Sequence, residues 1–197
     1  MLANISILQQ GLNQIASKYV SFSEKCKRDI EKYSGIESFK KNQIAVKEGS
    51  YSDVAYFIIT GSARAYYLKD GKDITDWFAF DNDFICAMDS FFLNISSPDY
   101  IQFTEKSIVI TISNKSINFL CNKHHEFEKL IRIIVTTQML RLQKRIVSLQ
   151  FETAQQRYDN LLLLYPSIEN KFALGHIASF LGITQETLSR LRASRRF

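Results

Sequence analysis

The feature that most constrains the fold is a change of hydrophobic period near residue 113. From Ile36 to Ser113, short runs rich in Val, Ile, Tyr and Phe alternate with turn residues, which is typical of antiparallel strands. Between Glu126 and Gln150, apolar residues instead recur at helical spacing with no Gly or Pro. The sequence therefore predicts an α+β fold in which a sheet precedes a long helix.

Turn residues divide the β-rich stretch into strands. The clearest hairpin signal is Asp70-Gly71, because Asp and Gly adopt positive φ angles at low cost. Several short strands at this spacing must cover or close their edges, which favours a jelly roll, a sandwich or a small barrel. The expected strands are Val54 to Ile59, Ala63 to Leu68, Ile74 to Phe80 and Ile108 to Ile112.

Two short helices are expected before the sheet. Residues 4–19 carry apolar side chains at helical spacing. Ser21 and Glu24 have the spacing of a capping box, so we expect a second helix to begin there and to end near Tyr33.

The long helix at residues 126–150 is apolar on two faces, and such a helix usually packs against two neighbours. One neighbour is then the sheet domain, and the other is the same helix of a second subunit in a twofold homodimer. The alternative is one long core helix of a monomer. The stripe expected to form the dimer consists of Phe127, Ile131, Val135, Leu142, Ile146 and Leu149.

Residues 174–196 have the spacing of a helix-turn-helix motif. Ile177, Ala178 and Leu181 line one face of a short helix, and Gly182 can end it in the left-handed conformation. Thr184 is a suitable N-cap for a second helix that carries the next apolar face. The alternative is a helical hairpin with a solvated basic end.

If the leucines of the second helix point inward, its polar side chains project outward at positions that contact DNA bases. Gln pairs with adenine, Glu accepts a hydrogen bond from cytosine, and Arg binds guanine with two hydrogen bonds. The expected base-reading residues are Gln185, Glu186, Ser189 and Arg190. The expected phosphate contacts are Thr184, Thr187, Arg192, Arg195 and Arg196.

Composition narrows the classes of protein that remain. With 46% hydrophobic residues the chain can bury a core, and a net charge of +5 favours anionic partners only mildly. Gln9 and Gln10 interrupt the N-terminal apolar segment, so no membrane span is expected and a cytoplasmic location is predicted. We find no Ser/His/Asp order, P-loop or dinucleotide glycine pattern, and therefore expect neither an enzyme nor a cofactor.

The cysteines and histidines do not predict a metal site. Cys26, Cys86 and Cys121 are widely spaced and favour reduced thiols over a disulfide framework or a zinc site. His124 and His125 are neighbours, and neighbouring residues on a helix do not share a face. A solvated helix start is therefore the expectation for this pair.

Four segments of the chain resemble the Crp/Fnr family of transcriptional regulators. They are VKEGSYSDVAYFIITGSARAYYLKDGKDI, NDFI, TAQQRYDNLLLLYP and IASFLGITQETLSR. The resemblance implies a cyclic-nucleotide-binding-like jelly-roll sensor domain at 1–125, a dimerisation helix at 126–150 and a (winged) helix-turn-helix DNA-binding domain at 151–197. It also implies double-stranded DNA and RNA polymerase as partners. In the family an Arg-Glu pair and a second Arg read the bases, and Gln185 departs from that pattern.

The sensor departs further from the family. A cyclic-nucleotide pocket there uses a Gly-Glu pair followed by an Arg that meets the phosphate, whereas this chain has Cys86-Ala87 and Ser97-Pro98, and no Lys or Arg occurs from Phe84 to Thr104. A buried phosphate without a cation loses its charge-assisted hydrogen bonds, so we expect no binding of cAMP or cGMP.

The side chains of the sensor pocket then either enclose a different effector of low charge or fill the space. Cys86 is a candidate thiol sensor, and the alternative is an inert buried cysteine. The runner-up for the whole chain is a ligand-sensing or protein-interaction module whose C-terminal helices bind a protein partner. The candidate pocket residues are Phe84, Cys86, Ala87, Phe91, Ser97 and Tyr100.

Overall fold

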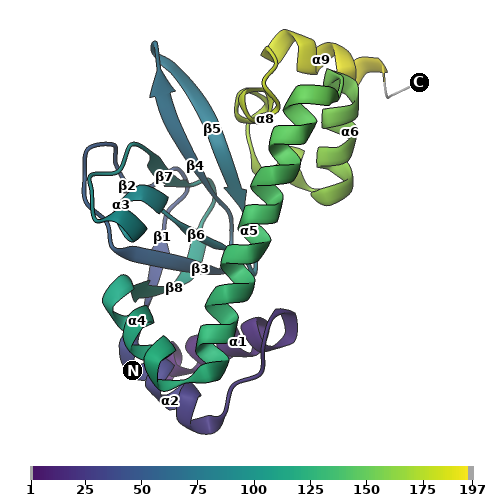
Figure 1. Ribbon diagram of the computed structural model, residues 1–197. Coiled ribbons are helices and arrows are strands. Elements are labelled where there is room, and N and C mark those ends of the chain that lie inside the picture. The colour runs from purple at the N-terminus through teal and green to yellow at the C-terminus, as the bar shows by residue number, and fades with distance from the viewer. Residues whose placement is uncertain (1, 195–197) are drawn as a thin grey trace.

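The computed structural model describes residues 2–194, with side chains from Ser6 onward, and places a β domain before a helical one (Figure 1). The first part of the chain forms α1 (Leu2–Lys18), α2 (Glu24–Tyr33), β1 (Ser34–Phe39), β2 (Ile44–Val46), β3 (Val54–Thr60), β4 (Ala63–Lys69), β5 (Lys72–Ala79), β6 (Phe84–Cys86), α3 (Met88–Leu93), β7 (Tyr100–Phe103) and β8 (Ser107–Ser113). The second part forms α4 (Asn114–Lys123), α5 (His125–Phe151), α6 (Ala154–Leu164), α7 (Ile168–Lys171), α8 (Leu174–Leu181) and α9 (Gln185–Ser194).

Within these residues the strands form two four-stranded antiparallel sheets, ordered β1-β8-β3-β6 and β2-β7-β4-β5. This is the jelly roll that the sequence predicts. Asp70 and Gly71 have φ angles of 52° and 74°, so the expected tight turn joins β4 to β5. That hairpin extends beyond the rest of the sheet, and β5 contacts α8 (Figure 1).

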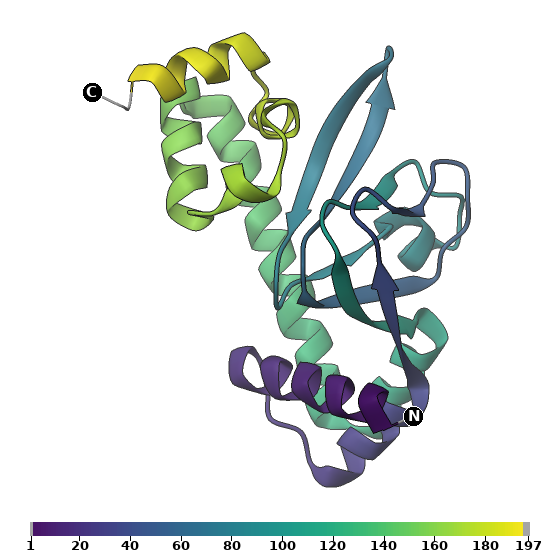
Figure 2. The same ribbon diagram turned by 180° about the vertical axis from the view of Figure 1, so that it is seen from behind.

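The central strand β3 of the first sheet is buried on both of its faces. Tyr56 and Ile58 of β3 face a core between the sheets, whereas Phe57 and Ile59 face a second core under α1, α2 and the start of α5. Figure 2 shows α1 crossing the end of the β domain. Burial on both faces explains why β3 is a continuous apolar run.

The start of α2 corrects one prediction. Ser23, not Ser21, is the N-cap, and its hydroxyl accepts a hydrogen bond from the backbone N–H of Cys26 at 3.2 Å. Glu24 is the first helical residue and therefore does not occupy the third position that a capping box requires.

The helix α5 is 27 residues long and connects the β domain (α1 to β8) to the helices α6–α9, which we call the helical domain (Figure 1). Thr153 and Gln156 form a capping box that begins α6. The helix α6 then lies beside the C-terminal end of α5 (Figure 1). A winged helix-turn-helix has a β-hairpin wing beside its helices. Among the described residues no strand follows β8, so the expected wing has no counterpart there. None of the helices within residues 2–194 combines the length and the hydropathy needed to span a membrane.

Candidate nucleic-acid interface and sensor site

The turn of the helix-turn-helix motif is built on Gly182. Its φ and ψ angles of 68° and 33° are left-handed, and its N–H donates to the carbonyls of Ala178 and Ser179. The N–H of Ile183 also donates to the carbonyl of Ala178, at 3.0 Å. These bonds cap the carbonyl end of α8 in the way the sequence predicts, so α9 begins at a fixed angle to α8.

The helix α9 is anchored by one face and open on the other. Leu188 is fully buried in the core of the helical domain. The four predicted base-reading residues all lie on the exposed part of the helix: Gln185, Glu186, Ser189 and Arg190. Their side chains are therefore accessible to a groove of DNA.

The local contacts of Glu186 set the charge of the exposed face of α9. The backbone N–H of Glu186 and the hydroxyl of Thr184 lower the pKa of the Glu186 carboxyl, and Arg190 one turn later adds to the effect. Glu186 is therefore an ionised acceptor at neutral pH. The N-terminal end of α9 thus carries an acceptor at Glu186 and a donor at Arg190.

The predicted phosphate-binding residues have different surroundings. The Thr184 hydroxyl accepts from the backbone N–H of Thr187 at 3.2 Å and lies 3.1 Å from the Thr187 hydroxyl, as expected of an N-cap. The Nε of Arg192 pairs with Glu169 at 2.7 Å, so part of its guanidinium is already committed within the domain. Arg195 and Arg196 lie outside the described residues.

The helical domain is fixed to the β domain by polar and aromatic contacts. Arg145 of α5 donates to Asp76 Oδ1 at 2.6 Å and to the carbonyl of Phe180 at 3.3 Å. Its guanidinium also lies 4.4 Å from the centre of the Phe180 ring. Phe78 of β5 is buried in the core of the helical domain, with its ring centre 4.3 Å from that of Phe172. Strand β5 of the second sheet therefore helps to set the orientation of α8 and α9.

The predicted sensor pocket does not form as one site, which corrects that prediction. Residues along a strand alternate between faces, so Cys86 of β6 lies in the core under the N-terminal helices while the next residue, Ala87, lies in the core between the sheets. Phe84 and Phe91 share the first of these cores, and Phe84 packs on Phe57 with ring centres 4.8 Å apart.

The two remaining pocket candidates are also placed elsewhere. Ser97 is buried in a tight turn, where its hydroxyl donates to the carbonyl of Asp99 at 2.8 Å. Tyr100 stacks on Tyr66 with ring centres 4.9 Å apart, and the neighbouring Ile101 faces the core instead. The six residues therefore serve the two cores, the turn and the sheet surface separately.

The space between the sheets is filled by apolar side chains. Phe39 stacks on Phe103 with ring centres 4.0 Å apart, and Tyr56 packs edge-on against both rings. The buried cation of the second sheet, Arg64, lies on that sheet's other face and makes a paired contact with Asp73 at 2.6 Å. An anionic phosphate would meet no cation in this core among the described residues.

Cys86 has the surroundings of an inert thiol. Burial raises its pKa to about 12, and its Sγ lies 3.7 Å from Met88 Sδ. Since the thiolate is the reactive form, a thiol with this pKa is protonated at neutral pH. These surroundings favour the inert alternative over a thiol sensor.

The helix α5 exposes an apolar stripe in its C-terminal half. Successive positions are four and three residues apart, the heptad spacing of a coiled coil. Met139, which is not a member of the stripe predicted from the sequence, completes this spacing between Val135 and Leu142. The members and their exposed fractions are Val135 47%, Met139 59%, Leu142 46%, Ile146 56% and Leu149 43%.

Two members of the predicted dimer stripe are less exposed than these five residues. Phe127 is a correction, because it is buried in the subunit core beside Phe22. Ile131 packs partly against the same core.

A groove of about 970 Å³ lies between α5, α6 and β5 and includes Leu142 and Leu149 of the stripe.

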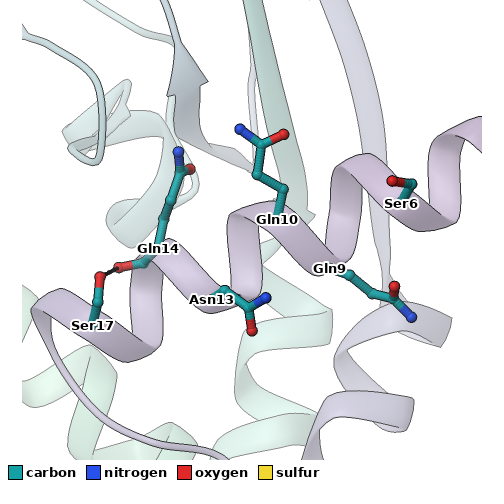
Figure 3. A pocket seen from close by; sticks show the side chains of 6 residues that line it. All are labelled: Ser6, Gln9, Gln10, Asn13, Gln14 and Ser17. Carbon is teal, nitrogen blue, oxygen red and sulfur yellow. Dashed lines mark hydrogen bonds between the residues drawn. The ribbon is translucent and has the colours of Figure 1, made fainter.

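A shallow polar depression of about 520 Å³ follows α1 (Figure 3). The Ser17 hydroxyl donates to the carbonyl of Gln14 at 2.9 Å, and none of the lining residues is titratable. The lining therefore consists of serine hydroxyls and side-chain amides. Its lining residues are Ser6, Gln9, Gln10, Asn13, Gln14 and Ser17.

The fold is similar to that of several solved bacterial regulators. FixK2 from Bradyrhizobium japonicum is 18% identical with a TM-score of 0.71, and the match covers 82% of this chain and 83% of that one. A CooA mutant from Carboxydothermus hydrogenoformans is 16% identical with a TM-score of 0.71, covering 94% and 84%. TTHB099, a CRP-family transcriptional regulator from Thermus thermophilus, is 17% identical with a TM-score of 0.65, covering 81% and 84%.

No protein-family model matches the chain, and no curated protein matches it in sequence. The structural matches therefore establish the fold, which is the α+β fold of Crp/Fnr regulators that the sequence predicts.

Proposed function

We propose that this chain, which has the fold of the Crp/Fnr regulators, is a sequence-specific DNA-binding transcriptional regulator that acts as a homodimer. The observation that carries the proposal is the exposed face of α9. Leu188 anchors the helix, while Glu186 and Arg190 stay accessible one turn apart. A recognition helix of this kind places its N-terminal residues on base edges in the major groove.

The test of DNA recognition is the substitution Arg190→Ala. We first select the operator by sequencing genomic fragments that the purified protein retains, and then measure affinity by fluorescence anisotropy. The variant is expected to lose about 1–3 kcal/mol of discrimination at one base position. Wild-type affinity is also expected to fall steeply with salt, since phosphate contacts release counterions.

The control is Arg132→Ala, which removes an exposed arginine of α5 that pairs with Glu128. We expect it to leave base discrimination unchanged. Equal wild-type affinity for the operator and for random duplex would contradict the proposal. It would favour the alternative in which the C-terminal helices bind a protein partner.

The homodimer is proposed to form through the apolar stripe of α5, with Phe127 excluded. Pairing two such stripes would cover side chains that are 43–59% exposed in one chain. It would also present two recognition helices to successive major grooves, about 34 Å apart on DNA. The operator should accordingly be a pseudo-palindrome.

The substitution Ile146→Glu tests this dimer, because it buries a carboxylate in the apolar seam. We expect sedimentation equilibrium to show monomers and operator affinity to fall at least tenfold. Lys144→Glu introduces the same side chain at an exposed position of α5 that is not a member of the stripe, and it should leave the dimer intact. A dimer that survives Ile146→Glu unchanged would show that another surface holds the subunits together.

The sensor domain is proposed not to bind cAMP or cGMP, because aromatic side chains fill its interior and its buried arginine is paired elsewhere. Calorimetry with each nucleotide should therefore show no saturable heat. RNA polymerase and an unidentified effector are proposed partners on the family resemblance, as are a cytoplasmic location and the absence of enzymatic activity.

A further inference from the structure

One face of α2 meets the junction between α4 and α5 through polar side chains. Ser23, Cys26 and Asp29 are three residues apart and so lie along the same side of the helix start. They face His124 and Glu126. Cys26 is fully buried and His124 is 5% exposed, so the prediction of a solvated helix start is wrong for His124.

Hydrogen bonds already hold the two sides together. The Ser23 hydroxyl donates to Glu126 Oε1 at 2.6 Å. Asp29 Oδ2 lies 2.7 Å from His124 Nε2 and 2.7 Å from the ammonium of Lys123. Asp29 therefore fixes the orientation of the imidazole ring and leaves Nδ1 as the nitrogen for a second ligand.

Three different metal-binding atoms converge between these contacts. The Sγ of Cys26, a ring nitrogen of His124 and a carboxylate oxygen of Glu126 all lie within 4.8 Å of one another. Ligand atoms of a tetrahedral zinc ion, with bonds of about 2.0–2.3 Å, are roughly 3.3–3.8 Å apart. Small side-chain rotations would therefore close this set around an ion.

The charges in the cluster are suited to a divalent cation. Asp29 is paired with Lys123, whereas Glu126 is held by a hydrogen bond from the Ser23 hydroxyl and has no cationic partner among the described residues of the cluster itself. A dication bound by the Cys26 thiolate and the Glu126 carboxylate would make the charges of the site sum to zero. Balanced charge is what a largely buried ionic site requires.

We propose that Cys26, His124 and Glu126 form a zinc(II) site that fastens α2 to the start of α5. Zinc accepts sulfur, nitrogen and oxygen ligands together, whereas magnesium and calcium prefer oxygen alone. Water takes the fourth position, because Glu126 borders solvent. On binding, the Cys26 S–H bond breaks, its proton goes to solvent and an S–Zn bond forms. Asp29 holds His124 from outside the coordination shell, a common arrangement in zinc proteins.

The first test is a zinc titration of the full-length protein, reduced and stripped of metal, against a chromophoric chelator. We expect one zinc ion per chain. Glu126→Gln and Cys26→Ser should each weaken binding at least tenfold, and Asp29→Asn should weaken it about 10–100-fold. The matched controls are Glu128→Gln, on the same turn of α5, and Cys121→Ser, and both should retain wild-type affinity.

Two further measurements separate coordination from misfolding. Cobalt(II) should give a thiolate charge-transfer band in the wild type and in Cys121→Ser, and none in Cys26→Ser. Added zinc should raise the melting temperature of Glu128→Gln but not of Glu126→Gln, a variant of a border residue that is expected to fold. Substoichiometric zinc, a cobalt spectrum without the thiolate band, or equal losses in Glu126→Gln and Glu128→Gln would overturn the proposal. None of these readouts involves DNA, so the proposal stands or falls separately from the regulator function.

Discussion

Single residues in this protein owe their properties to which face of a strand or helix they occupy. Cys86 and Ala87 are adjacent in the sequence, yet the first lies under the N-terminal helices and the second lies between the sheets. These two neighbours in the sequence therefore cannot line one pocket, because their side chains enter different cores. The same alternation places Arg64 outside the core that a nucleotide would enter.

Asp99 carries a prediction about pH. Burial first, and then Asp76 and Asp89, raise the pKa of its carboxyl to about 6 from 3.8. The folded state thus binds this proton more tightly than the unfolded state, so the stability from Asp99 falls as pH rises from about 4 to about 6. We expect Asp99→Asn to stabilise the protein at pH 7 and to change little at pH 3.5, as measured by urea unfolding. A variant less stable than wild type at pH 7 would contradict this sign.

Among the helices, the turn between α8 and α9 depends most on one backbone conformation. The left-handed Gly182 caps α8, and a Cβ at this position would lie 3.3 Å from Leu149 Cδ2 of α5. The turn is thus packed against the helix that carries the apolar stripe. The sequence defines this turn through Gly182, and Leu149 of α5 packs against it from a distant part of the chain.

The substitution Gly182→Ala should cost about 1 kcal/mol of unfolding free energy, because a side chain is disfavoured at this φ angle. It should also weaken operator affinity by tilting α9. Gly49→Ala is the control, since Gly49 has a φ angle of 78° and open space around it. That variant should lose similar stability, by chemical denaturation, and retain DNA affinity. Equal DNA affinity for the two variants would indicate that the turn does not set the position of α9.

At the scale of the whole molecule, the β domain contributes Phe78 and Phe80 to the core of the helical domain. Phe78 and Phe80 of the β domain contact Phe172, Phe180 and Tyr165 of the helical domain. The Ser179 hydroxyl accepts from the backbone N–H of Thr75 at 3.1 Å across the same boundary. A displacement of β5 would therefore reach α8 through direct packing.

The packing of β5 into the helical domain predicts that both domains unfold in one cooperative transition. Phe78→Ala should cost about 3–5 kcal/mol, as is usual for removing a buried phenylalanine. It should also speed amide hydrogen exchange in α8, although the substitution lies in β5. Phe92→Ala removes a ring that is 51% exposed and should cost less than about 1 kcal/mol. Exchange in α8 that is unchanged by Phe78→Ala would show that the domains are energetically independent.

The sequence alone determined the features that depend on local periodicity and turn chemistry. These include the β-rich stretch, the Asp70-Gly71 hairpin, the long helix and the Gly182 turn, because alternation, positive φ and capping act within a few residues. Short strands such as β2 and β6, which have three residues each, were not individually predicted, since they are defined by their partners.

Only the tertiary structure decided which distant side chains meet. It separated the six pocket candidates, buried Phe127 beside Phe22, and brought Cys26 to His124 across the packed helices. No local pattern encodes these contacts, because packing of whole elements depends on the shapes of both surfaces at once.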